Sequence, residues 1–573
     1  MSLKSNFVMA IVLCVNFENS TFAATANNPY LKNAGEAYRK LPEAKKTGTL
    51  YLEQLTNPKV LNPLIISDVN YADILPLIFS RLMERDYETG QYYFQLAEKI
   101  DVSKDHKRLT YTLRKGVVWE DGSPVTADDA EFTFKTLMDP KTDAAPLRTY
   151  FDGYHFEKLD NQSFRFTIDN PNVTSVDEVN DDFKIIQKKQ YDGVADFNKA
   201  KGIIAPIGNG PYKVKSFSRD QSLVFERNKE WWGYKIPELK NQYNFDTIVY
   251  RILPDKALAY EKLIKGDLDI LEMNAEIYGN KVRGSDQDKF GRDAKTDKAV
   301  WADHFKTQAP AQWTYIGWNN KRPIFASKKT RQALAYLINY DEIIHKVYYG
   351  EAIHCISPFG SSTPNTAPDQ KSKAFDFNVQ KGLKLLKEDG WADLDNSNTL
   401  SKVIDGKKTK FEFVLRFNSE NSLRSKIAQI VKEQFKKAGV IVNVQALEFN
   451  SLLGMIENRD FDAIVMGWGN GMLHADSKQI WHTRSWINKG SNSVGYSNPD
   501  VDLLIDQASS ELDATKHFKL NQKIGAMIYD DQPYAFLLEV PGFISGFQTR
   551  KVKAKKWAMK YDSTPAIWMY SPE

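Results

Sequence analysis

Cysteine is almost absent from this sequence of 573 residues. It has only Cys14 and Cys355, and the first lies in a segment that we expect to be removed. The mature chain therefore cannot form an internal disulfide bond, and it must be stabilised by its size and packing. A lone thiol within "AIHCISPF" is more typical of a small buried hydrophobic residue than of a nucleophile.

The motifs of common catalytic and nucleotide-binding sites are also absent. The sequence has no HExxH, no GxSxG, no GxxxxGK[ST] and no GxGxxG that opens a helix. Its histidines gather with acidic residues in one place only, at His474, Asp476 and His482. We therefore predict no catalytic residue, no metal and no cofactor. An exported enzyme, or a metal-chelate receptor that uses His474 or His482, stays open as an alternative.

An excess of charge of one sign is missing as well. The 77 basic and 73 acidic residues leave a net charge of +4, which gives no reason to expect a nucleic-acid surface. The content of 42% hydrophobic and 26% charged residues is typical of a soluble globular protein. Since 573 residues are too many for one hydrophobic core, we expect two or more lobes. We also expect the protein to be a monomer.

The first 26 residues differ from the rest of the chain. Lys4 precedes a short apolar run at 7–17, which small and polar residues follow, as in a secretory signal peptide. The apolar run is too short to remain in a bilayer as an anchor. We expect cleavage after Ala23 or Ala26 and a periplasmic location for the mature protein.

The first half of the chain is rich in strand signals. Apolar and polar side chains alternate at 109–113, and two hairpins are predicted to turn at Asp160–Asn161 and Arg219–Asp220. A helix is predicted after Thr126, because Asp129 stands where it can complete a capping box. These signals indicate a predominantly antiparallel sheet.

The second half alternates strands with helices. Strands are predicted at 411–418, 440–449 and 461–468, and helices at 421–439 and 450–460. Such alternation with short connections is typical of an α/β fold with a largely parallel sheet. Ligands of these sheets usually lie at the carboxyl ends of the strands.

One strand ends in an unusual stretch, "FDAIVMGWGNGMLHADSKQIW" (461–481). Its glycines allow a close approach of the backbone, Trp468 and Trp481 offer flat apolar surface, and His474 and Asp476 offer directional polar groups. We interpret the stretch as one wall of a pocket for a small polar ligand. The alternative for both tryptophans is a place in the core.

Three long segments point to a family. They are "LAEKIDVSKDHKRLTYTLRKGVVWEDGSPVTADDAEFTFKTLMDP" (96–140), "PIGNGPYKVKSFSRDQSLVFERNKEWWG" (206–233) and "YIGWNNKRPIFASKKTRQALAYLINYDEIIHKVYYG" (315–350). Together they resemble the extracellular solute-binding proteins of family 5, the peptide- and nickel-binding receptors of ABC importers. The third segment resembles the branch that includes the oligopeptide-like microcin-uptake receptors.

The resemblance implies the two-lobed α/β fold of periplasmic binding proteins, with an extra subdomain inserted in lobe I and no catalysis. The expected division of the chain is 1–26 signal peptide, 27–68 lobe I, 69–205 inserted subdomain, 206–308 lobe I, 309–535 lobe II and 536–573 a return to lobe I.

The resemblance also implies a ligand site between the lobes. Arg416 resembles an arginine that meets the ligand carboxylate in dipeptide-binding members, and a guanidinium group suits that partner. The predicted contacts are Asn57 and Tyr71 from lobe I, and Arg416, Asn418, Trp468, Asn470, His474 and Asp476 from lobe II.

One position departs from the family pattern. Peptide-binding members often carry an aspartate three residues after the tryptophan, where it neutralises the ligand ammonium, but here that residue is Gly471. A buried ammonium group without a carboxylate partner is costly. Either Asp476 takes the role, or the ligand amine is solvated, or the ligand has no free amine.

We therefore expect a substrate-binding receptor of an ABC importer, which captures a small solute and delivers it to a membrane-embedded permease. A peptide is the first candidate for the ligand. The alternatives are a nickel or metal-chelate receptor, an oligosaccharide receptor that stacks Trp468 and Trp481 on sugar rings, and an exported enzyme.

Overall fold

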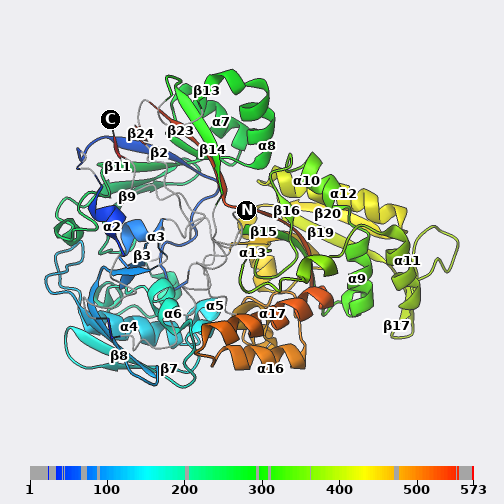
Figure 1. Cartoon of the computed structure of the whole chain (residues 1–573), viewed down its shortest axis with the longest axis horizontal. Helices are drawn as coiled ribbons and strands as arrows, with labels where there is room; N and C mark the ends of the chain where they lie inside the picture. Colours follow the sequence, from blue (N-terminus) through cyan, green and yellow to red (C-terminus); the bar gives the residue numbers. More distant parts are fainter. Residues whose placement is uncertain are drawn as a thin grey trace, which may run out of the picture.

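Two α/β bodies, joined by two stretches of chain, make up the computed structural model (Figure 1). The structure describes residues 34–41, 43, 45–65, 74–86, 89, 91–200, 205–291, 296–306, 312–361, 363–469 and 477–549, and the backbone of 23–24, 552–553 and 571–572. One body contains a sheet of eight strands and the other a sheet of six. The predicted α/β fold of two lobes is therefore confirmed.

The sheet of eight strands belongs to lobe I. In spatial order its strands are β13 (Phe290–Gly291), β14 (Val300–Phe305), β23 (Phe543–Gln548), β12 (Ile270–Glu272), β2 (Thr49–Gln54), β11 (Thr247–Ile252), β10 (Ser222–Arg227) and β9 (Tyr212–Ser218). β2 is parallel to both of its neighbours. The turn predicted at Arg219–Asp220 is confirmed, since Asp220 has a φ of 58° between the antiparallel strands β9 and β10.

A separate antiparallel sheet forms the subdomain inserted in lobe I. In spatial order its strands are β1 (Ala23–Ala24), β5 (Ala97–Val102), β6 (Arg108–Leu113), β8 (Ser163–Ile168) and β7 (Tyr154–Lys158), and its helices are α4 (Ala127–Met138), α5 (Ala145–Tyr150) and α6 (Ser175–Asp182). The predicted capping box is confirmed, because the backbone N–H of Thr126 donates to Asp129 Oδ2 over 2.9 Å. The predicted strand at 109–113 and the hairpin turn at 160–161 are also present.

The sheet of six strands belongs to lobe II. In spatial order its strands are β16 (Ile353–His354), β22 (Tyr534–Val540), β15 (Gln312–Trp318), β21 (Ala463–Trp468), β19 (Glu412–Asn418) and β20 (Ile441–Leu447). The predicted parallel arrangement is confirmed for β19, β20 and β21. β15 is antiparallel to both of its neighbours. The chain enters β15 from lobe I at the same edge of the sheet where it leaves β22 for lobe I, so these two strands run in opposite directions.

Helices cover both main sheets. In lobe II they are α9 (Lys328–Tyr336), α10 (Tyr340–Lys346), α11 (Val379–Glu388), α12 (Ser422–Lys437), α13 (Phe449–Glu457), α14 (Lys478–Trp481), α15 (Thr483–Ile487), α16 (Pro499–Ala508) and α17 (Ala514–Asp531). The remaining elements are α2 (Glu36–Arg39), α3 (Leu75–Ile78), α7 (Lys256–Lys265), α8 (Ala275–Ile277), β3 (Met83–Arg85), β4 (Tyr92–Phe94), β17 (Ser401–Ile404), β18 (Lys407–Lys410), β24 (Val552–Lys553) and β25 (Ser571–Pro572).

The two crossings between the lobes orient both sheets. One crossing runs from Phe305 at the end of β14 to Gln312 at the start of β15, and the other from Val540 at the end of β22 to Phe543 at the start of β23. β14 is parallel to β2 and β12, and β22 is parallel to β21, so these strands all end on the side of the crossings. The carboxyl-terminal edges of the two sheets therefore face each other. The crossing predicted near 309 lies outside the described residues. The return to lobe I predicted at 536 comes later in the structure, because β22 pairs with β15 in the sheet of lobe II up to Val540.

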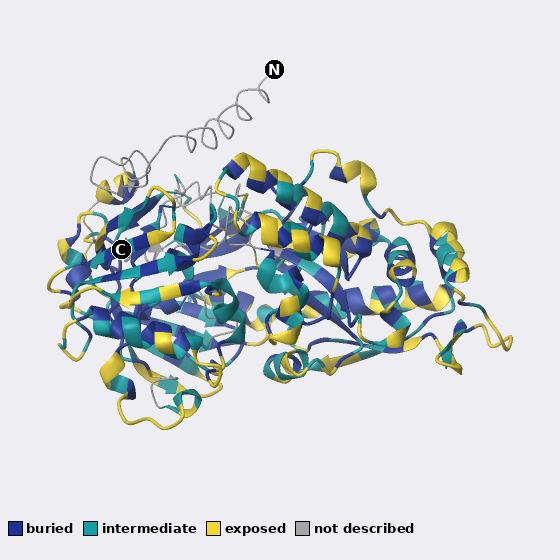
Figure 2. Cartoon of the chain, turned by 90° about the horizontal axis from the view of Figure 1, so that it is seen from below, coloured by how far each residue is buried: buried dark blue, intermediate teal, exposed yellow. Residues whose placement is uncertain are grey.

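Both lobes bury apolar side chains in their cores. The buried residues of the chain are dark blue in Figure 2. Cys355 is fully buried in lobe II, and burial raises the pKa of its thiol well above the ordinary value. The prediction of a small buried residue at this position is confirmed.

A buried carboxyl group lies in β22, next to the second crossing. Glu539 is 2% exposed, and its Oε2 accepts a hydrogen bond from the backbone N–H of Ser361 over 2.9 Å. Burial raises the pKa of Glu539 from 4.5 to about 6, because desolvation disfavours the charged form.

Exchanging Glu539 for glutamine should change the pH dependence of stability. Because its folded-state pKa is raised, the protonated carboxyl contributes stability that is fully present below about pH 4.5 and lost as the pH rises through 6. The Glu539→Gln protein should therefore be more stable than the wild type by about 2 kcal/mol at pH 8 and about equal to it near pH 4. Urea unfolding at both pH values measures this, and a difference that does not vary with pH would contradict it.

Candidate functional site

The facing edges of the two sheets hold the predicted site residues that the structure describes. Asn57 follows β2 on lobe I, Arg416 and Asn418 lie in the last three residues of β19, and Trp468 is the last residue of β21. The other predicted contacts lie outside the described residues; they are Tyr71, Asn470, His474 and Asp476.

Asn57 is held by the neighbouring β9–β10 turn. Its Nδ2 donates to Asp220 Oδ1, and its Oδ1 accepts a hydrogen bond from the backbone N–H of Asp220 over 2.7 Å. Both ends of the amide therefore have a partner within lobe I. This pairing ties the exit of β2 to the turn, and a ligand contact by the Asn57 side chain would have to compete with it.

Arg416 is half-buried and joins two parallel strands. Its Nε donates to Gln445 Oε1 of β20 over 2.9 Å. Within the described residues no carboxylate oxygen lies within 4.0 Å of its guanidinium nitrogens. The group is thus oriented by an amide and keeps donors for a further acceptor.

A second arginine, absent from the predicted set, lies beside Asn418 and β21. Arg424 Nη1 donates to Asn418 Oδ1 over 2.7 Å and lies 3.3 Å from Met466 Sδ. Its Nη2 would lie 3.3 Å from a Cβ atom placed on Gly467. The lack of a side chain at Gly467 therefore lets the guanidinium group lie against the end of β21.

The charge of Arg424 has no direct counterion in the described part of the chain, where no carboxylate oxygen lies within 4.0 Å of it. The nearby Glu420 is engaged elsewhere, since its carboxylate accepts hydrogen bonds from Asn418 Nδ2 and from the backbone N–H of Phe449. Burial lowers the pKa of the Arg424 guanidinium. An arginine in this state is suited to receive an anionic ligand group.

The sequence holds one signal that could have identified Arg424, its position at the start of a helix. Asn421 caps α12 through the backbone N–H of Arg424, so Arg424 occupies the first turn. Cations are disfavoured there, because the helix macrodipole places positive charge at the amino-terminal end. An arginine at this position after a strand end therefore indicates a role other than helix stability.

Three aromatic side chains lie side by side in the sheet of lobe II. They are Tyr315 in the middle of β15, Trp468 at the end of β21 and Tyr534 at the start of β22, and we call them the aromatic group. The rings of Tyr315 and Tyr534 are stacked with centroids 4.0 Å apart, and Trp468 is nearly parallel to Tyr315 at 6.5 Å. Trp468 Nε1 donates to the hydroxyl of Tyr534 over 3.4 Å. Only Trp468 is half-buried, so it is the member that offers apolar surface to a ligand.

Trp481 and His482 have structural roles. Trp481 is 1% exposed and packs on Tyr534 at 4.8 Å, so it cannot stack on a sugar ring. His482 caps α15, since its Nδ1 accepts a hydrogen bond from the backbone N–H of Arg484 over 3.0 Å. Among the described residues, no three His, Cys, Asp or Glu side chains are grouped closely enough to hold a metal ion.

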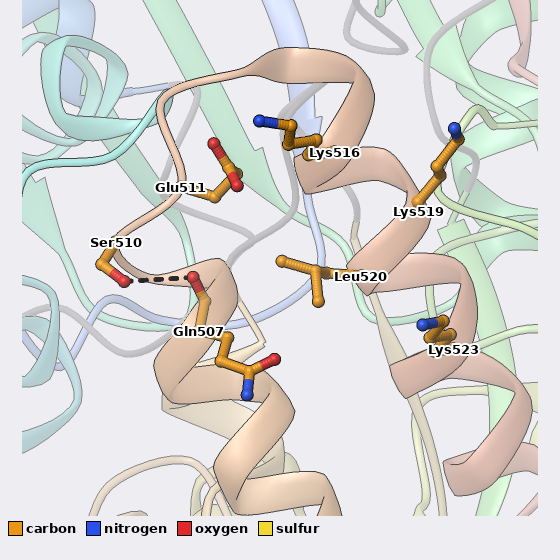
Figure 3. Close-up of a pocket in the computed structure, with 7 residues that line it drawn as sticks. All are labelled: Gln507, Ser510, Glu511, Lys516, Lys519, Leu520 and Lys523. Atoms are coloured by element: carbon orange, nitrogen blue, oxygen red, sulfur yellow. Dashed lines mark hydrogen bonds between the residues drawn. The ribbon is translucent and has the colours of Figure 1, made fainter.

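A surface hollow of about 440 Å³ lies apart from these edges, between α16 and α17 (Figure 3). Its lining residues are mostly exposed; they are Gln507, Ser510, Glu511, Lys516, Lys519, Leu520 and Lys523. All belong to lobe II, and none is a predicted site residue. The hollow does not lie between the two sheet edges where a closing site is expected.

Comparison with known proteins identifies the family. The model of the bacterial extracellular solute-binding proteins, family 5, matches residues 91–489. The chain belongs to this family. The resemblance inferred from the three sequence segments is confirmed.

Individual relatives share the length and the fold of this family 5 protein. The oligopeptide-binding protein AppA of Bacillus subtilis (strain 168) is 29% identical over 537 residues, which are 92% of this chain and 91% of AppA. The structure of AppA in complex with a nonapeptide has a TM-score of 0.81 at 27% identity and covers 93% of this chain and 100% of its own. The structure of NikZ from Campylobacter jejuni in complex with Ni(L-His) shares the fold, with a TM-score of 0.74 at 21% identity. The match covers 92% of this chain and 99% of the NikZ chain.

Proposed function

We propose that this family 5 protein is the substrate-binding receptor of an ABC importer that captures a short peptide and delivers it to a membrane-embedded permease. The observation that carries the proposal is Arg424, a guanidinium group without a carboxylate partner among the described residues, at the edge of lobe II that faces lobe I. The carboxyl terminus of a peptide supplies that partner, and Trp468 offers apolar surface nearby. The relative AppA, an oligopeptide-binding protein, supports a peptide as the ligand.

The proposed mechanism is closure of the lobes around the ligand. A ligand that contacts both edges at once stabilises the closed form, because it loses half of its contacts when the lobes part. In lobe II, Asn418 positions Arg424 and Gln445 positions Arg416. The remaining contacts of the proposal are Asn57, Tyr71, Trp468, Asn470, His474 and Asp476.

The proposal describes a binding protein without catalysis, exported to the periplasm as a monomer and without a nucleic-acid partner. The relatives of the chain are solute-binding proteins, which supports a role in binding. In the part of the chain that the structure describes, no helix combines the length and apolar character needed to cross a bilayer.

The test is to identify what the natively purified protein carries. We expect mass spectrometry of the molecules released by denaturation to find short peptides. Adding such peptides to the stripped protein at 100 times the Kd should raise the free energy of unfolding by about 2.7 kcal/mol. A sugar, a nickel chelate or a turned-over product in place of peptides would contradict the proposal and favour the corresponding alternative.

A further inference from the structure

The inserted subdomain contacts lobe II directly. In α5 the hydroxyl of Tyr150 donates to Gln479 Oε1 of α14 over 2.9 Å, and Gln479 Nε2 donates to the backbone oxygen of Pro146 over 3.3 Å. One glutamine of lobe II is thus held at both ends of its amide by one helix of lobe I. Both hydrogen bonds join the two lobes directly.

An ion cluster lies beside these hydrogen bonds. The Oδ2 atom of Asp152, just after α5, lies 3.3 Å from Lys478 Nζ and 3.5 Å from Arg484 Nη1. One carboxylate of the subdomain therefore faces two cations of lobe II. The attraction is between the lobes, since Asp152 belongs to one and both cations belong to the other.

A third point of contact lies after α16. The side-chain Nδ2 of Asn172 donates to the backbone oxygen of Ser509 over 3.1 Å, and the backbone N–H of Val173 donates to the backbone oxygen of Glu511 over 3.0 Å. Hydrogen bonds between main chains of two lobes require a close and specific fit. We call the three points of contact together the subdomain latch.

The subdomain latch lies away from the crossings. Figure 1 shows α5 beside α16 and α17 at the lower side of the molecule, whereas β14 and β23, which lead to the crossings, lie at the upper side. When two lobes rotate about a hinge, displacement grows with distance from the hinge axis. Opening therefore has to break the subdomain latch.

The subdomain latch is also connected to the candidate site. Trp481, the last residue of α14, packs on Tyr534 at 4.8 Å. Tyr534 in turn accepts the hydrogen bond of Trp468. A rigid aromatic path thus links the helix that α5 holds to the exposed surface of the aromatic group.

We infer that the subdomain latch closes the protein without ligand, so that a closed form exists before the ligand arrives. Asp152 is the electrostatic centre of the subdomain latch, because its Oδ2 atom lies within 3.5 Å of a cationic nitrogen of both Lys478 and Arg484. The Asp152 ion pairs stabilise the closed form only moderately, since partly exposed ion pairs are weak and are screened by salt. The inference does not rest on the identity of the ligand.

The experiment measures the distance between the lobes in the ligand-free protein. Spin labels on Leu159→Cys of the subdomain and Leu503→Cys of α16 suit this, since these residues are 39% and 59% exposed, whereas Cys355 is fully buried. The protein is unfolded, dialysed and refolded to remove bound ligand. We then expect two distances between the labels, a short one from the closed form and a long one from the open form. Asp152→Asn should lower the ratio of the short-distance population to the long-distance population three- to tenfold.

A matched control and a salt titration make the test specific. Glu157→Gln removes an exposed ion pair with Arg165, at 3.1 Å, that lies wholly within the subdomain, and it should leave the ratio unchanged. Salt at 1 M should lower the ratio in the wild type but hardly in Asp152→Asn. A wild type with only the long distance, or equal effects of Asp152→Asn and Glu157→Gln, would overturn the inference.

A charge exchange adds an independent measurement. Asp152→Lys should lower the ratio further than Asp152→Asn, because the new lysine repels Lys478 and Arg484. The double variant Asp152→Lys, Lys478→Asp should recover part of the loss. If the double variant has the same ratio of short to long distances as Asp152→Lys alone, the charges at positions 152 and 478 do not act on each other.

Discussion

Replacing Arg424 with glutamine should weaken the binding of a short peptide with a free carboxyl terminus about 100-fold, which equals about 2.7 kcal/mol. The reason is that glutamine loses the positive charge and the forked donors that match a carboxylate. The partly buried position strengthens the effect, because burial lowers the effective dielectric constant around the ion pair. Calorimetry with a peptide that co-purifies with the protein measures the change.

The chemical form of the peptide isolates the contact. The same peptide with an amidated carboxyl terminus should bind wild type and Arg424→Gln with nearly equal affinity, since it lacks the charge that Arg424 receives. A suitable control is Arg322→Gln, which removes a surface arginine of lobe II that pairs with Asp460 and Asp462, and which should not change binding. A 100-fold loss in Arg416→Gln together with no loss in Arg424→Gln would assign the carboxylate to Arg416 instead.

The parts of the fold that the sequence predicted correctly depend on neighbours along the chain. The capping box at Thr126 and Asp129 spans one helical turn, and the turn at Asp220 spans two residues between strands. Alternation at 109–113 needs only the period of a strand. The parallel order of β19, β20 and β21 followed from short connections through helices, which permit few topologies.

The parts that the sequence did not predict depend on residues far apart in the chain. Asn57 is held by Asp220 and Trp481 packs on Tyr534, and no local pattern indicates either pair. Such pairs are set by tertiary packing, so side chains that look available in the sequence are already engaged in the fold. The same reason explains β15, whose direction follows from the crossings between the lobes and not from its own residues.

The candidate site shows the same division. Arg416, Asn418 and Trp468 were predicted from strand ends and from family resemblance, and the structure places them at the facing edge of lobe II. Arg424 was missed, because its helix satisfies the ordinary pattern of a helix except for a cation in the first turn. Tyr71, Asn470, His474 and Asp476 stay predictions.

The glycines of "PIGNGPY" explain why one of the three family segments is needed for the fold. A Cβ atom at Gly210 would lie 2.6 Å from the backbone oxygen of Leu77 and 2.6 Å from the backbone carbon of Ile78. The backbone N–H of Gly210 also donates to the Ile78 oxygen over 2.7 Å. The segment therefore packs backbone against backbone on α3, whose apolar side chains are buried.

Exchanging Gly210 for alanine should destabilise lobe I by at least about 3 kcal/mol, because the clash is with main-chain atoms that no rotamer change can move away. Urea unfolding followed by tryptophan fluorescence measures the loss, and Trp231 and Trp232, which both donate to the backbone oxygen of Asn209, report on this region. The matched control is Gly454→Ala in α13. No atom lies within 4 Å of a Cβ placed there, so alanine should stabilise the helix by up to about 1 kcal/mol. Equal free energies of unfolding for the two variants would show that the close contact between Gly210 and α3 does not contribute to the stability of lobe I.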